Sequence, residues 1–276
     1  MAVNLAEKYA SSLLQAFNQA SLTAGKVNTE FEFNGVAAIH ILTAVTQALN
    51  DYKRTGTNRY GEPTELQDTE QDLILTKDKS FSISIDRGNN DDQMGAKKAG
   101  TVVKAQIGEQ VTPFFDQLAI TNWCAGAGNH YVNTTLDKNT VLDCFIEAHK
   151  AFFNNHFQVN PMNCFAYVKT STYAFLLRNP EFISVESLGG KILTNGEVGK
   201  CMSFTVVETP DTYFPDGIQA LFTHKRAVMQ PQKLNELFVR TNVQGISGTV
   251  IEGRYRGDAF VLDALKNGVF KIQTAA

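Results

Sequence analysis

The chain has 276 residues, of which 43% are hydrophobic, enough for a sizeable core in one large domain or two intergrown ones. Its net charge is −3, and it shows no arginine-rich face or basic tail, which disfavours tight, salt-sensitive binding to nucleic acid. No apolar stretch approaches the roughly 20 residues that span a bilayer, and no basic, then apolar leader opens the chain. We therefore expect a soluble protein without an export signal or a membrane partner.

The residue types that usually carry catalysis or bind metals lack the spacings that such sites need. Histidines are scattered without an H-E-x-x-H pattern, and the pair His149 and His156 with Glu147 nearby does not make up for it. The sequence contains no G-x-G-x-x-G, Walker or G-x-S-x-G motif. We expect no enzyme activity, no cofactor, and no catalytic, cofactor-binding or metal site. The four cysteines form no C-x-x-C pair, which indicates buried free thiols: Cys124, Cys144, Cys164 and Cys201.

In chain order, the first predicted elements surround an unusually polar segment. Residues 4–19 place apolar side chains at helical spacing and predict an amphipathic arm. Residues 27–45 contain alternating aromatic and aliphatic residues, which indicates extended structure. The polar segment, residues 50–71, reads NDYKRTGTNRYGEPTELQDTEQ. After it, residues 80–86 alternate serine with Phe, Ile and Ile, so a strand with one buried face is expected.

A long helix follows the strand. Apolar residues at helical spacing predict that it runs from about Asp91 to Trp123, with the polar run NNDD at its start providing cap and dipole partners. Three glycines weaken it, at about 1 kcal/mol each relative to alanine. Pro113 is expected to bend or interrupt it, because proline lacks the N–H group that an interior helical residue donates.

The remaining chain alternates helices and strands without a regular βαβ rhythm. The predicted elements are a helix at 141–153, a strand at 164–170, a short helix at 172–179, a hairpin turning at Asn195–Gly196, a strand at 220–229, and short strands between 248 and 272. This order favours the α+β class.

The polar segment is too long to fold back on its own body. If Ile41–Tyr60 and Leu66–Ile85 form the arms of a hairpin, each arm extends up to roughly 65 Å, whereas a domain of this length is about 50 Å across. Its charges are sorted, with cations in the first half and acids in the second. Salt bridges across the ribbon would explain the sorting, at no more than about 1 kcal/mol per exposed pair. Contact with a neighbouring identical subunit is the alternative explanation, because charges select partner and register there.

The residues expected to make these intersubunit contacts are Lys53, Arg54, Arg59, Tyr60, Glu62, Glu65, Asp68 and Glu70. The segment 50–71, the run SIDRGNNDDQM at 84–94 and the run GRYRGDAFVLDALKNGVF at 253–270 together resemble the major capsid proteins of tailed bacteriophages. These proteins share the HK97-like fold, and the resemblance covers nearly the whole chain in order.

The resemblance implies a division of the chain into family domains. Residues 1–30 would form the N-terminal arm, and 48–87 the extended loop. The peripheral domain would combine 31–47, the spine-helix region 88–134 and the C-terminal strands 245–276. The axial domain would be 135–244.

The implied function is that of a structural shell protein. The chain would assemble through pentamers and hexamers into an icosahedral shell enclosing double-stranded DNA without sequence-specific binding. Its partners would be a separate scaffolding protein, a portal protein and any decoration proteins, and it would reside in the virion after assembly in the host cytoplasm. Two alternatives stay open: an encapsulin-like nanocompartment of the same fold, and an α+β enzyme or binding module, which the missing site motifs disfavour.

Overall fold

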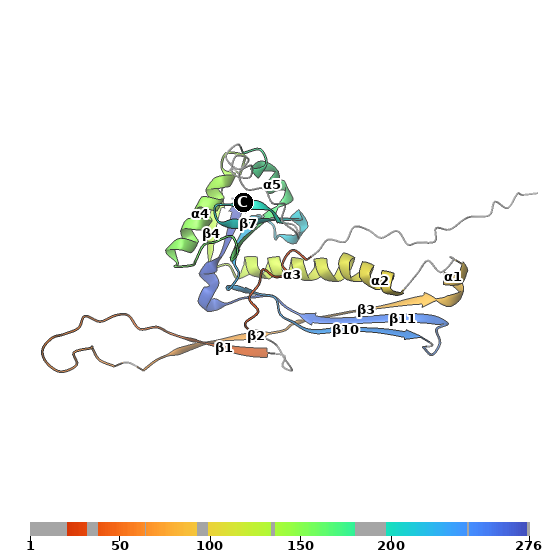
Figure 1. Ribbon diagram of the computed structural model, residues 1–276, viewed down its shortest axis with the longest axis horizontal. Helices are drawn as coiled ribbons and strands as arrows, with labels where there is room; N and C mark the ends of the chain where they lie inside the picture. The colour runs from red at the N-terminus through yellow and green to blue at the C-terminus, as the bar shows by residue number, and fades with distance from the viewer. Residues whose placement is uncertain are drawn as a thin grey trace, which may run out of the picture.

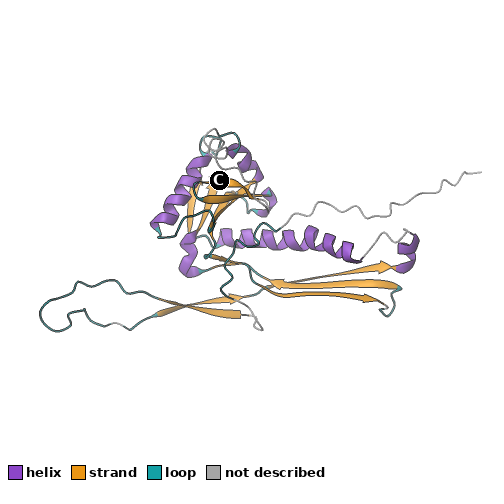
Figure 2. Ribbon diagram, in the orientation of Figure 1, coloured by secondary structure: helices purple, strands orange, loops and turns teal. Residues whose placement is uncertain are grey.

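The computed structural model describes residues 21–31, 38–63, 65–92, 99–133, 136–179, 197–241 and 243–274. Figure 1 shows three parts: a globular unit built on one sheet, a long flat sheet beneath a helix, and a thin ribbon that projects away from both. The mixture of helices and strands that the sequence predicts is evident in Figure 2. The predicted arm helix at 4–19 and the turn at Asn195–Gly196 lie outside the described residues.

The long sheet contains three antiparallel strands in the order β10-β11-β3: β3 (Lys77–Asp86), β10 (Gln232–Thr241) and β11 (Gly248–Gly257). The predicted strand at 80–86 is therefore confirmed, and its alternating pattern puts Ile85 in the interior while Ser84 is exposed. The strand pairing expected for these residues, with the first arm of the projecting hairpin, is wrong. Residues 77–86 pair with β11 and do not form the second arm of the projecting hairpin. Alternation predicts which face is buried, but it carries no information on which strand lies alongside.

A helical rod lies over the long sheet. It comprises α2 (Ala99–Gln106), a π-helical turn η1 (Ile107–Val111) and α3 (Thr112–Ala125), which Figure 1 shows as one continuous rod. The short helix α1 (Arg87–Asp92) follows β3, and residues 93–98, where the predicted helix from Asp91 would continue, lie outside the described residues. Val103 packs against the sheet residues Ile85 and Ile251. The interruption predicted at Pro113 takes the form of the π turn: the Thr112 N–H donates to the Ile107 carbonyl, five residues back. The wider turn relieves the clash that a proline ring makes in a regular α-helix.

The globular unit is a three-layer arrangement around a six-stranded sheet. Its strands are, in spatial order, β4 (Asn129–Asn133), β13 (Val269–Thr274), β8 (Ile218–His224), β5 (Cys164–Lys169), β7 (Phe204–Thr209) and β6 (Glu197–Cys201). Helices α4 (Val141–Asn154) and α5 (Thr170–Leu176) cover one face, and α3 covers the other.

Strand β5 shows how one sequence serves both layers. Ala166 and Val168 pack in the core beneath α4, whereas Phe165 and Tyr167 face Trp123 of α3. Because successive side chains point to opposite faces, a strand buried on both sides reads as continuously apolar. The predicted elements at 141–153, 164–170 and 172–179 are confirmed within a few residues. The four cysteines are free and buried, as predicted.

One short pairing and two 3-10 helices complete this part of the fold. β9 (Val228–Met229) pairs with β12 (Phe260–Val261). η2 (Asp211–Tyr213) connects β7 to β8, and η3 (Asp263–Gly268) connects β12 to β13. The single strand predicted at 220–229 is wrong, because a turn at 225–227 divides it into β8 and β9. That turn is closed by the hydrogen bond from the Ala227 N–H to the His224 carbonyl. None of the helices in the described ranges is both long and apolar enough to cross a membrane.

The sheets combine strands from more than one of the predicted domains. The six-stranded sheet is drawn mostly from residues 135–244 but includes β4 and β13 from outside that range, while β10 from inside it belongs to the long sheet. β3 likewise belongs to the long sheet, although 48–87 was assigned to the extended loop. The division into family domains is defined by position in an assembled shell, and it stays a prediction.

Candidate assembly interface

The projecting ribbon is anchored by one short antiparallel pair. β1 (Ala38–Ala44) pairs with β2 (Asp68–Ile74), from Ala38 opposite Ile74 to Ala44 opposite Asp68. One more hydrogen bond, from the Val45 N–H to the Gln67 carbonyl at 2.9 Å, continues the pairing. Residues 46–66 then run out as a loop far from the rest of the chain (Figure 1). A hairpin that projects from the body is what the length of the polar segment predicted.

The root of the ribbon is apolar and packed against the body. Ile41 and Leu73 lie in a small core with Leu75, Met229 and Leu262. The tip beyond it has no such core. At the tip, the Lys53 N–H donates to the Arg59 carbonyl at 3.0 Å, and the rings of Tyr52 and Tyr60 meet edge to face at 5.1 Å. The loop is thus shaped by its own local contacts.

Turn residues give the tip its shape. Gly56 and Gly61 have φ angles of 91° and 90°, and Asn58 has a φ of 56°, so all three occupy the left-handed region that glycine and asparagine tolerate best. The Gly61 N–H donates to the Asn58 carbonyl at 3.0 Å, and the Arg59 Nε donates to the Gly56 carbonyl at 3.2 Å. The run RTGTNRYG therefore forms a defined turn, behind which Tyr60 meets Tyr52.

The ribbon exposes large apolar side chains. Tyr60 is 84% exposed, Leu66 is 65% exposed, and Leu49 is fully exposed. Leu42, Val45, Tyr52 and Ile74 of the same ribbon are also among the exposed large hydrophobic residues. Seven exposed large apolar side chains on one narrow projection provide apolar surface that a contact with another molecule would bury. The structure thus adds an apolar component that the charge pattern alone did not reveal.

The predicted contact residues are all exposed: Lys53, Arg54, Arg59, Tyr60, Glu62, Glu65, Asp68 and Glu70. Among the residues that the structure describes, none of the three cations forms an ion pair with an acidic side chain. Glu70 does lie 3.1 Å from His40 Nδ1 across the ribbon, so both explanations of the charge sorting stay open. The structure brings Lys53 and Arg59 together through a backbone hydrogen bond.

One acidic contact on the ribbon involves a histidine that the sequence analysis did not assign. The His40 Nδ1 lies 2.6 Å from Asp72 Oδ1 and 3.1 Å from Glu70 Oε1, across the β1–β2 pair. Hydrogen bonding to Asp72 is the main cause of a raised His40 pKa, with further contributions from the charges of Asp72 and Glu70. In the described part of the chain this is the one group of three side chains that could share a metal ion, and all three are exposed. The short contacts suit a protonated histidine held by two carboxylates.

A buried carboxylate fixes the point where the ribbon joins the body. Asp258, which is 3% exposed, accepts hydrogen bonds from the Thr76 N–H at 2.9 Å and the Thr76 hydroxyl at 2.6 Å. It also accepts from Asn122 Nδ2 at 3.1 Å and from the Ala259 N–H at 2.9 Å. Asp258 therefore ties the link between β2 and β3 to helix α3. We call Asp258, Thr76 and Asn122 the root clamp.

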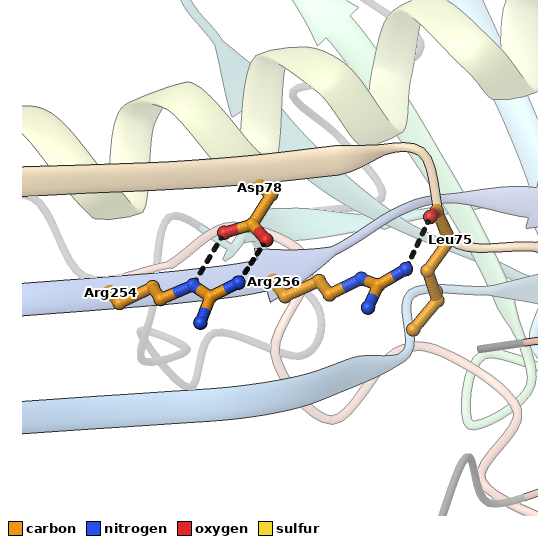
Figure 3. Close-up of polar contacts among 4 residues, drawn as sticks. All are labelled: Leu75, Asp78, Arg254 and Arg256. Carbon is orange, nitrogen blue, oxygen red and sulfur yellow. Dashed lines mark hydrogen bonds and ion pairs between the residues drawn. The ribbon is translucent and has the colours of Figure 1, made fainter. Parts of the chain in front are cut away.

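Two arginines of β11 extend the fastening along the same link (Figure 3). Arg254 donates from Nε and Nη2 to the two carboxylate oxygens of Asp78, at 3.0 and 2.6 Å, in a bidentate pair. This contact is the main reason that the pKa of Asp78 is lowered. Arg256 donates from Nη2 to the Leu75 carbonyl at 3.3 Å. The segment from Leu75 to Asp78 is thereby held to β11 at two places, which sets the direction in which the ribbon leaves the body.

The comparisons with known proteins agree with this architecture. No protein-family model matches the chain, and no curated protein matches its sequence. Solved structures match over almost its whole length. A chain of Mycobacterium phage Che8 is 17% identical with a TM-score of 0.74, and the match covers 99% of this chain and 98% of that one.

Two further matches come from structures described as capsids. A chain from the capsid of the cyanophage P-SCSP1u is 13% identical with a TM-score of 0.78, covering 99% of this chain and 93% of that one. A chain from the mature capsid of bacteriophage PhiM1 is 11% identical with a TM-score of 0.72, covering 98% and 92%. The fold of this chain is that of phage capsid proteins, and the predicted α+β, HK97-like fold is confirmed.

Proposed function

We propose that the chain is the major capsid protein of a tailed phage or prophage, and that its ribbon joins neighbouring subunits of the shell. The observation that carries this proposal is a projection with exposed apolar groups and exposed charges on a fold shared end to end with phage capsid chains. The similarity spans nearly all of both chains, so no large part of either is left over for a different activity. A structural role, without catalysis, fits best.

In this proposal, self-assembly proceeds through pentamers and hexamers to an icosahedral shell that encloses double-stranded DNA. The ribbon of one subunit covers the body of the next, where Lys53, Arg54, Arg59 and the acidic second half select partner and register. Because every subunit offers the same ribbon and the same receiving surface, the contact is heterologous and closes around a ring. The wider partners are a separate scaffolding protein, a portal protein and decoration proteins, and the assembled protein resides in the virion after assembly in the host cytoplasm.

The first alternative is an encapsulin-like compartment that holds protein cargo. The matched structures favour the phage shell, since they come from phages and phage capsids. Packaged content separates the two. Nuclease-resistant DNA inside purified particles is expected for the phage shell, whereas particles that hold only protein cargo would overturn that assignment.

The role of the ribbon is tested by charge reversal at its exposed cations. The double variant Arg54→Glu and Arg59→Glu should fold normally, because both side chains lie outside every packed core. It should fail to form shells with the scaffolding protein, as judged by sedimentation and negative-stain images. The matched control, Arg54→Lys and Arg59→Lys, keeps the charges at the same positions and should assemble. Equal particle yields from the reversed and control variants would refute the intersubunit role.

A second variant tests whether the ribbon is dispensable for folding. Deletion of residues 53–70 removes the tip and part of β2 but none of the four packed cores. The circular dichroism spectrum of the unassembled subunit should stay close to that of the full chain, while particle formation is lost. An unfolded deletion variant would contradict the view that the tip acquires its order from a neighbour.

A further inference from the structure

Strand β10 forms an open edge of the long sheet. Within the described residues, the order β10-β11-β3 leaves β10, a strand of ten residues, paired on one side. Three consecutive apolar side chains near its end are exposed: Leu237 at 41%, Phe238 at 47% and Val239 at 52%. A long edge strand with exposed apolar residues offers unpaired N–H and C=O groups to any other strand, and natural proteins usually cover or block such edges. This edge carries no proline or bulge at residues 236–241.

The strand register shows which face each of these side chains occupies. Val239 lies opposite Ile251, which is fully buried beneath the helical rod, so Leu237 and Val239 point to the helix side of the sheet. Phe238 lies opposite Glu252 on the other side. There the Arg240 guanidinium stands 5.2 Å from the Phe238 ring centroid and 3.5 Å from Glu252 Oε2. The helix-side face of the edge therefore carries apolar groups, and the other face carries Phe238 between Glu236 and Arg240.

The sequence of the edge is complementary to itself when it is read in the opposite direction. Residues 236–240 read Glu-Leu-Phe-Val-Arg. If two such strands lie antiparallel with Phe238 facing Phe238, Glu236 of each copy faces Arg240 of the other. Leu237 of each copy then faces Val239 of the other. Both charge pairs and both apolar pairs are formed at once, on the faces where cross-strand neighbours interact.

From this pattern we propose that β10 pairs with β10 of a second copy of this chain, antiparallel about a two-fold axis at Phe238, to give a continuous six-stranded sheet. An axis perpendicular to the sheet keeps both helical rods on the same side, because facing residues share a face. The same patch serves both copies, which is what a two-fold interface requires. Arg240, already next to Glu252, gains the second copy's Glu236 as another carboxylate partner.

Other registers satisfy fewer groups. With the axis at Leu237, Glu236 faces Phe238. With the axis at Val239, Arg240 faces Phe238. In both registers the two charge pairs are lost. A slip of two residues, with the axis at Glu236 or Arg240, would place like charges opposite each other. The β10 contact is separate from the ribbon contact, so it stands or fails independently of the ribbon's proposed role.

A single cysteine at the axis tests the register directly. Facing residues of an antiparallel pair have Cα atoms about 4.5 or 5.5 Å apart, within the range that a disulfide spans. The full-length variant Phe238→Cys should give covalent dimers under mild oxidation at high protein concentration. The matched control Glu236→Cys should not, because the two copies of residue 236 would lie about 14 Å apart along the strands. The native cysteines are buried and contribute little background.

The outcomes of the disulfide experiment are decisive in both directions. Dimers from Phe238→Cys alone support the proposed register. No dimers from Phe238→Cys, or equal dimer yields from both variants, would overturn it. Phe238 is half exposed, and its replacement is expected to leave the melting temperature of the subunit close to that of the wild type. If the wild-type chain forms no shells while Phe238→Cys still forms dimers, that result counts against the capsid role and leaves the β10 pairing in place.

A charge swap provides an independent test should the cysteine variant not fold. Glu236→Arg or Arg240→Glu alone places like charges opposite each other at both ends of the contact. Each single reversal should lower the fraction of chemically cross-linked dimer by at least about tenfold. The double variant Glu236→Arg and Arg240→Glu restores opposite charges and should recover the wild-type fraction. Failure of the double variant to recover, or single reversals that leave the fraction unchanged, would refute the pairing.

Discussion

The strongest test of the root clamp is the replacement of its buried carboxylate by Asp258→Ala. The carboxylate accepts four hydrogen bonds, two of them from Thr76. Hydrogen bonds to a charged group contribute about 1.5–3 kcal/mol each, but bonds that share one acceptor are not additive. Removal of the acceptor leaves the buried Ala259 N–H without this partner, whereas the exposed Thr76 can bond water and Asn122 keeps the Ala259 carbonyl. We expect the free energy of unfolding to fall by about 3 kcal/mol, the upper end of the range for one hydrogen bond to a charged group.

The assay is chemical denaturation of the unassembled subunit, supported by thermal melting. For a chain of this size, a change of about 3 kcal/mol corresponds to a fall of roughly 6–12 °C in the melting temperature. The control is Asp216→Ala, which removes an exposed aspartate and should alter stability by less than about 0.5 kcal/mol. A loss below about 1 kcal/mol for Asp258→Ala would refute the reasoning, because the Ala259 N–H would then have found another acceptor at little cost.

Two further predictions concern the ribbon histidine and the globular core. Since contact with Asp72 raises the His40 pKa, the contribution of His40 to ribbon stability is fully present below the unfolded value of about 6.5 and is lost as pH rises through the raised folded value. An NMR titration of His40 should give a midpoint above that of His40 in an Asp72→Asn variant; equal midpoints would contradict the assignment. Phe145→Ala should destabilise the subunit by about 3–5 kcal/mol, because Phe145 is 1% exposed and packs edge to face on Phe222 at 4.9 Å. Denaturant melts measure that loss, and a value near that of an exposed substitution would show that the cavity collapses.

Local sequence patterns predicted the elements of the fold better than their partners. The alternation of Phe81, Ile83 and Ile85 fixed a strand and its buried face, and both are confirmed. The same alternation could not show that this strand pairs with β11, which lies far along the chain, instead of with the first arm of the ribbon. Strand pairing depends on contacts between distant segments, which a local pattern does not record. The projection itself was predictable because length and polarity are local properties.

The clamp at the root of the ribbon shows what the sequence analysis missed. Asp258 follows a glycine and precedes an apolar run, a context that also suits an exposed turn residue. Its burial depends on Thr76 and Asn122, which are distant in sequence. The predicted contact residues Lys53, Arg54 and Arg59 were accessible to sequence reasoning because their charges are sorted within one segment. Their expected contact with a neighbour remains a prediction, and the exposed Tyr60 and Leu66 add the apolar groups that such a contact would bury.

A ribbon of this kind works only if its direction is set at the root. From Val45 to Gly56 the outgoing arm is about 40 Å long when extended. A tilt of about 10° at the root would therefore move the tip by roughly 7 Å, which exceeds the distance of about 4 Å over which side chains touch. Asp258 and the contacts of Arg254 and Arg256 on β11 hold the link where such a tilt would arise, whereas the contacts described at the tip are those of its own turn. If the ribbon contacts a neighbouring subunit as proposed, the polar contacts at the root decide where the exposed residues at the tip meet it, and damage to the root should disturb assembly at sites that it never touches.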